Sequence, residues 1–159
     1  SQYAATFVTQ TIAGYKGREA ELRGQMERSP SSDNLALYIE YAQELVESGL
    51  FEGLEQKRYI SMLDSAAWKL YSKNPERLLD SNITALLASW QKTGNEEKTA
   101  AWMNVVRARS EVSLECFKTY AEHCYRKGDK EAFFDLMASL KYSSVSLDYE
   151  ALEWVRFFA

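Results

Sequence analysis

Apolar residues recur along the chain in a pattern that returns three times, and each copy ends at a glycine, Gly49, Gly94 or Gly128. The same four positions before the glycine, at minus eleven, eight, seven and four, carry largely apolar side chains in every copy. These offsets place four side chains on one face of a helix. The residues are Tyr38, Tyr41, Ala42 and Leu45; Ile83, Leu86, Leu87 and Trp90; and Phe117, Tyr120, Ala121 and Cys124. Each copy therefore predicts a helix with one buried face.

The last two copies lie 34 residues apart, and their similarity continues beyond the glycine. Thr99, Trp102, Met103 and Val106 follow the first glycine at the same offsets as Phe133, Leu136, Met137 and Leu140 follow the second. One repeat is therefore two helices joined at a glycine. A period of this length is typical of arrays in which neighbouring hairpins bury faces that none can bury alone. We expect an all-α fold of antiparallel helical hairpins, stacked as a short right-handed, α-solenoid-like repeat array.

The connections within the last two hairpins have the same residues in the same roles. Gly94 and Gly128 stand where a helix C-terminus needs a positive φ. Each is followed by a residue suited to an N-cap, Asn95 or Asp129. Upstream, Ser32 or Asp33 is the expected N-cap of the helix that ends near Gly49.

We expect one helical-repeat domain over residues 1–159, because a chain of this length with 46% apolar residues can bury a substantial core. Residues 1–28 predict one long helix or a helix pair, since three glycines interrupt the pattern. Hairpins are predicted at 33–74, 75–111 and 113–142, followed by a terminal helix at 148–159. Pro75 separates the first two hairpins and suits a first helical turn, so the next helix is expected to begin there.

The net charge of the chain disfavours two classes of binding partner. A net charge of −4 and a pI near 5.2 provide no overall attraction to nucleic acid or to an anionic membrane. No run of 18 apolar residues is present, so we expect a soluble protein without a membrane span.

Candidate catalytic and metal-binding chemistry is sparse. Cys116 and Cys124 are the only cysteines and stand about 12 Å apart if they share a helix, which is too far for a disulfide. His123 is the only histidine and adjoins Cys124, so the two side chains diverge by about 100°. We therefore predict no metal, no cofactor, no small-molecule substrate and no enzymatic activity. Reduced core cysteines favour an intracellular location, cytosolic or organellar, with mitochondria among the organelles that fit.

Residues 115–148 resemble a pentatricopeptide repeat, a relative of the tetratricopeptide repeat. The resemblance is carried by Phe117-Lys118-Thr119-Tyr120, Lys127-Gly128-Asp129-Lys130-Glu131-Ala132, Leu136-Met137, Leu140-Lys141 and Leu147-Asp148. In that family an aromatic residue opens the first helix, the glycine precedes the turn, and an aspartate often closes the unit. Many proteins with such helical pairs act only as scaffolds.

The resemblance also implies an RNA-binding alternative. The base-reading positions of the family would fall on Thr119 and Asp148, a pairing that tends to select guanine. Lys118, Arg126 and Lys130 would then lie near the phosphates of a single-stranded RNA. The acidic pI disfavours this partner.

The last predicted helix is strongly apolar, with Trp154, Phe157 and Phe158 near its end. Such a helix either folds back onto the core, meets another subunit, or stacks on further repeats. Because aromatic residues dominate protein-binding hot spots, we take these three as the candidate protein-interaction residues. The predicted function is a non-enzymatic scaffold or accessory subunit that binds protein partners, or itself, within a larger assembly.

Overall fold

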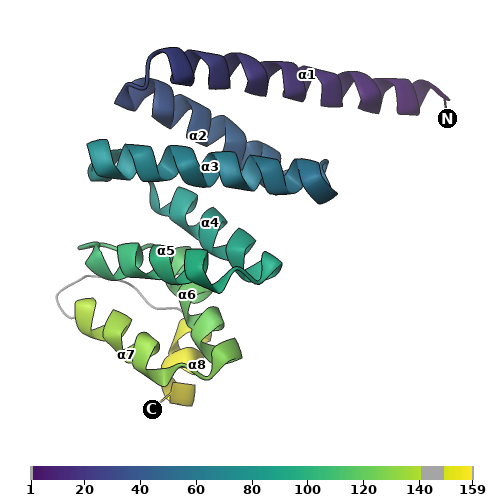
Figure 1. Cartoon of the computed structure of the whole chain (residues 1–159). Helices are drawn as coiled ribbons and strands as arrows, with labels where there is room; N and C mark the ends of the chain where they lie inside the picture. The colour runs from purple at the N-terminus through teal and green to yellow at the C-terminus, as the bar shows by residue number, and fades with distance from the viewer. Residues whose placement is uncertain (1, 141–148, 159) are drawn as a thin grey trace. The chain divides into compact units, whose positions relative to one another are not determined.

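The computed structural model of the protein describes residues 2–140 and 149–158, and within these ranges the chain is helical and has no strand (Figure 1). The helices are α1 (Gln2–Arg28), α2 (Ser32–Glu47), α3 (Gly53–Lys73), the 3-10 helix η1 (Pro75–Arg77), α4 (Asp80–Thr93), α5 (Glu96–Ala108), α6 (Leu114–Lys127), α7 (Lys130–Ser139) and α8 (Tyr149–Phe158). The all-α prediction is confirmed. The chain forms two compact units, unit 1 (Ser1–Leu78) and unit 2 (Leu79–Ala159). The single domain stays a prediction.

In unit 1, α2 packs against both α1 and α3. The first helix is continuous through its three glycines. Of the two predicted forms, one long helix or a helix pair, the structure has the single long helix. Among its described side chains the buried ones, Glu19, Leu22 and Met26, lie in the C-terminal part of the helix. The N-terminal half extends past α2 (Figure 1).

The N-cap of α2 differs by one or two residues from the prediction. Ser31, and not Ser32 or Asp33, adopts the extended backbone and accepts a hydrogen bond from the Asn34 backbone N–H. The reason is the turn before it, where the Ser31 N–H donates to the Ser29 carbonyl and helical geometry begins one residue later. Of the predicted stripe residues of α2, Tyr38, Ala42 and Leu45 are buried, and Tyr41 is half-buried.

A buried polar group joins α1 to α2. Glu19 is only 2% exposed, and its Oε2 accepts a 2.6 Å hydrogen bond from the hydroxyl of Tyr38, which is fully buried. The other carboxylate oxygen lies 3.4 Å from Nη2 of Arg23, one turn further along α1. Because buried charge is tolerated only where it is paired, these contacts fix how α1 lies on α2.

Alkaline pH is expected to destabilise the fold through Tyr38. Burial, and after it the hydrogen bond to Glu19, raises the pKa of Tyr38 far above its ordinary value of 10.0. A raised native pKa means that the stabilising contribution is complete below pH 10.0 and is lost above it, because the unfolded chain releases the proton first. In urea titrations over this range, the unfolding free energy of the protein is expected to fall more steeply than that of Tyr38→Phe, by up to about 1.4 kcal/mol per pH unit. Exposed Tyr3 supplies the control Tyr3→Phe. Equal slopes in all three proteins would contradict the assignment.

The start of the second hairpin was predicted wrongly. Pro75 opens only the short helix η1, and α4 begins at Asp80. Between them Leu78 and Leu79 take extended backbone, and Leu78 is fully buried. Burial of the Leu78 side chain thus accompanies the interruption of the helix, and Asn82 then accepts a hydrogen bond from the Leu79 N–H at the new helix start.

The two hairpin connections of unit 2 are built alike, as the sequence predicts. Gly94 and Gly128 have φ values of 74° and 65°. The residue after each glycine donates its N–H to a carbonyl five residues back, from Asn95 to Trp90 and from Asp129 to Cys124, both at 2.9 Å. The side chains of Asn95 and Asp129 then cap α5 and α7. The connections are therefore specified locally.

Within unit 2, α4 packs on α5 and on α6, α5 on α7, and α6 on α7 and α8. Asp80 ties the start of α4 to the connection between the hairpins, through an ion pair with Arg109 at 2.8 Å and a 2.6 Å hydrogen bond from the Ser113 N–H. The predicted stripe residues of the two hairpins are buried, with Met137 half-buried. Among the core side chains are Ile83, Leu86, Trp90, Trp102, Val106, Phe117, Tyr120, Cys124, Phe133 and Leu136.

Candidate interaction surface

Side chains from α6, α7 and α8 form a continuous series of ring contacts, here called the aromatic cluster. Its members are Tyr125, Phe133, Phe134, Trp154, Phe157 and Phe158. Tyr125 meets Trp154 and Phe157, in each case with 4.9 Å between ring centroids. Phe158 stacks on Phe133 at 4.5 Å. Offset and edge-to-face contacts of this kind add stability beyond area burial.

The aromatic cluster has an inner and an outer side. Phe133 is fully buried and Phe158 is 5% exposed, so these two rings belong to the core of unit 2. Phe157 is 62% exposed, and Tyr125 and Phe134 are also exposed. The exposed rings are therefore packed against rings that belong to the core of unit 2.

The structure separates the three residues that the sequence nominated for protein contact. Phe157 faces solvent, Trp154 is half-buried against Tyr125, and Phe158 is in the core. Of the alternatives open for the last helix, the described residues show packing onto α6 and α7. Phe158 is thus an anchor of α8, while Phe157 and Trp154 remain candidates for contact.

A pocket of about 550 Å³ beside the aromatic cluster gathers most of the residues of the RNA alternative. Lys118, Thr119 and Arg126 line it together with Trp154. Lys130 lies elsewhere, with its ammonium 5.7 Å from the ring centre of Phe134. Asp148 lies outside the described residues.

Charges in this pocket are balanced. Two carboxylates, Glu115 and Glu122, line it beside the two basic side chains. The guanidinium of Arg126 is held 2.5 Å from Glu122, and the Thr119 hydroxyl donates to the Glu115 carbonyl at 2.9 Å. The indole N–H of Trp154 is buried and has no acceptor in the described part of the chain. A pocket of this composition has no excess positive charge for phosphates.

Both cysteines lie in settings unsuited to nucleophilic chemistry. Burial raises the pKa of Cys116 to about 11 and that of Cys124 to about 12, which keeps both thiols protonated. Burial, and then the nearby Lys127 ammonium, lowers the pKa of His123. Across residues 2–140 and 149–158, no three His, Cys, Asp or Glu side chains converge as metal ligands do.

Sequence reasoning missed two members of the outer surface, Tyr125 and Phe134. Tyr125 lies three residues before Gly128, outside the four-position stripe, and Phe134 directly follows the buried Phe133. Their positions off the buried stripe, combined with large aromatic side chains, were the available signal.

Comparison with known proteins adds no relative, since no family model, curated protein or solved structure matches the chain. The resemblance to pentatricopeptide repeats stays a prediction. None of the helices that the structure describes has the length and apolar character needed to cross a membrane.

Proposed function

We propose that the protein is a non-enzymatic scaffold or accessory subunit that binds a protein partner through the outer side of the aromatic cluster. The observation that carries the proposal is the exposure of Tyr125, Phe134 and Phe157 within a connected group of rings. Isolated exposed aromatic residues are ordinary, whereas a grouped set is typical of protein-binding surfaces.

The packing of these exposed rings against buried ones supports the same proposal. Phe158 is held against Phe133, and Phe157, the next residue along α8, contacts both Phe158 and Tyr125. Aromatic side chains that are already packed lose little conformational freedom on binding, so more of the contact energy is retained as affinity.

A helical-repeat architecture would hold the residues of this surface in fixed positions. The packing of α4 on α6 and of α5 on α7 supports a stack of two hairpins, α4/α5 and α6/α7, with equivalent helices in contact. The duplicated glycine connections support the same arrangement. We infer a right-handed array related to the pentatricopeptide and tetratricopeptide repeats, in which the aromatic cluster occupies one end of the last hairpin.

Phe157→Asp is expected to abolish partner binding without unfolding the chain, because the Phe157 side chain is mostly exposed. Light scattering after size exclusion measures self-association, and mass spectrometry identifies the proteins retained at high salt. The matched control is Leu54→Asp, since Leu54 is an 84% exposed apolar side chain on α3, outside the aromatic cluster. An association lost in Phe157→Asp and kept in Leu54→Asp supports the proposal. Equal behaviour of the two variants would refute it.

Binding of single-stranded RNA is the second candidate function, favoured by the meeting of Lys118, Thr119 and Arg126 with Tyr125 and Trp154 in one pocket. Stacking aromatics and basic side chains are the usual components of such sites. This function predicts that RNA affinity falls steeply with salt and is reduced by Lys118→Gln and Arg126→Gln. Salt-resistant protein association with no RNA binding would decide for the scaffold.

A further inference from the structure

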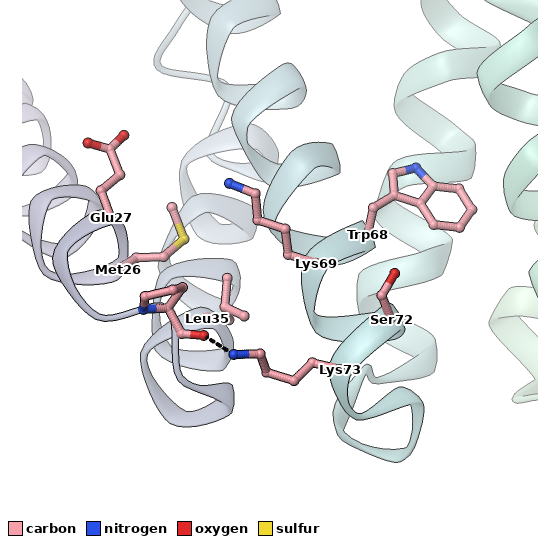
Figure 2. Close-up of a pocket in the computed structure, with 8 residues that line it drawn as sticks. Met26, Glu27, Leu35, Trp68, Lys69, Ser72 and Lys73 are labelled. Carbon is pink, nitrogen blue, oxygen red and sulfur yellow. Dashed lines mark hydrogen bonds between the residues drawn. The ribbon is translucent and has the colours of Figure 1, made fainter.

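Unit 1 contains a pocket of about 720 Å³ that the proposed function does not use. It lies where the end of α1 and the start of α2 face the C-terminal part of α3 (Figure 2). The lining residues are Met26, Glu27, Pro30, Leu35, Trp68, Lys69, Ser72 and Lys73. Its volume falls within the range of about 300–1,000 Å³ that is usual for small-molecule sites.

The base of the pocket is apolar. Its accessible apolar surface comes mainly from Pro30, which is exposed, and Trp68, which is half-buried, while Met26 is 3% exposed and Leu35 lies fully buried beneath. Figure 2 shows the Met26 side chain extending from α1 towards α3. Methionine adapts its shape to what it contacts, so such a base accommodates an alkyl chain without strict demands on its form.

Two lysines one turn apart on α3 provide the polar part. Lys73 Nζ donates a 2.7 Å hydrogen bond to the Pro30 carbonyl, which positions its ammonium and leaves two further N–H donors (Figure 2). Lys69 forms no ion pair with any described residue. The third charged side chain of the lining is Glu27, on α1. The charged lining thus sums to one positive charge beside an apolar base.

We propose that this pocket binds an aliphatic carboxylate of medium chain length. The alkyl chain packs on Met26, Pro30 and Trp68, and the carboxylate accepts a hydrogen bond from the ammonium group of Lys69. A single negative charge matches the net charge of the lining, whereas a phosphate dianion exceeds it. Burial of the chain supplies most of the affinity, and the lysines select the charged head group.

Calorimetric titration of the full chain with decanoate, below the concentration at which it forms micelles, tests the site. We expect saturable binding of one decanoate per chain and no saturable binding of decylamine, which carries the opposite charge. Lys69→Gln is expected to weaken decanoate binding about tenfold, as the loss of one charge-assisted hydrogen bond predicts. Lys57→Gln, an exposed lysine on the same helix outside the pocket, serves as the control and should bind as the parent does.

A second variant tests the position of the alkyl chain. Ser72 is exposed and lines the pocket, so Ser72→Phe fills the space without disturbing the core and is expected to abolish binding. Ser61→Phe places the same ring on an exposed part of α3 outside the pocket and should have no effect. Absence of saturable decanoate binding, equal affinity for decylamine, or parental affinity in Lys69→Gln or Ser72→Phe would overturn the proposal.

Discussion

Phe133→Ala is expected to lower the free energy of unfolding by about 3–5 kcal/mol, the usual cost of removing a fully buried phenylalanine. The Phe133 ring is fully buried and contacts Phe117 of α6, Phe134 of α7 and Phe158 of α8. Its loss opens a cavity and removes the ring on which Phe158 stacks. We therefore also expect faster amide hydrogen exchange in α8, because Phe158 loses the ring against which it stacks.

Phe134→Ala is the matched control, because it deletes the same ring from the next residue of the same helix, where the side chain is 40% exposed. Its expected cost is about 1 kcal/mol or less. Urea unfolding followed by circular dichroism measures both variants. Similar losses in the two, or unchanged exchange in α8 of Phe133→Ala, would show that Phe158 does not anchor the terminal helix.

Glu19→Ala is the second substitution with a large expected effect, a loss of about 2–4 kcal/mol in the free energy of unfolding. The change leaves the buried hydroxyl of Tyr38 without its 2.6 Å partner and removes the carboxylate that faces Arg23. The upper end of the range applies only if Arg23 finds no compensating water, and its side chain is 25% exposed.

A double-mutant cycle separates the hydrogen bond from packing. In a Tyr38→Phe background the hydroxyl is already absent, so Glu19→Ala should cost at least about 1 kcal/mol less than in the parent. Glu21→Ala is the exposed control, because Glu21 forms only a surface ion pair with Arg18, and its effect should stay within about 0.5 kcal/mol. Additive losses in the cycle would contradict a coupled Glu19–Tyr38 pair.

The helices and their connections were predictable wherever the determinants are local. Gly94 and Gly128 need positive φ, and the residues after them carry capping side chains. Both requirements are visible within a few residues of sequence. The buried stripes were predictable for the same reason, since helical spacing alone puts their members on one face.

The start of α4 was not predictable from local signals. Proline at position 75 satisfies the rules for a first helical turn, yet only a short 3-10 helix forms there. The backbone is extended at Leu78, whose side chain is fully buried. Burial of that kind depends on residues that are distant in sequence, which no local pattern contains.

The candidate sites show the same limit. A helix that is apolar on several sides does not reveal which side faces inward, so adjacent Phe157 and Phe158 were treated alike although only one is buried. The pocket of unit 1 combines residues of three helices, with Met26, Leu35 and Lys69 separated along the chain. Its members became neighbours only through the packing of α1 and α3 around α2.

The short connections at Gly94 and Gly128 have a consequence for the order of folding. Only two residues separate α4 from α5 and α6 from α7. Partner helices within a hairpin therefore find each other through a local search, and loop closure over such distances is completed in well under a microsecond. Contacts between hairpins require closure of much longer segments and form more slowly. We expect each hairpin of unit 2 to form early, with the meeting of α4 and α6 as the slower event that sets the folding rate.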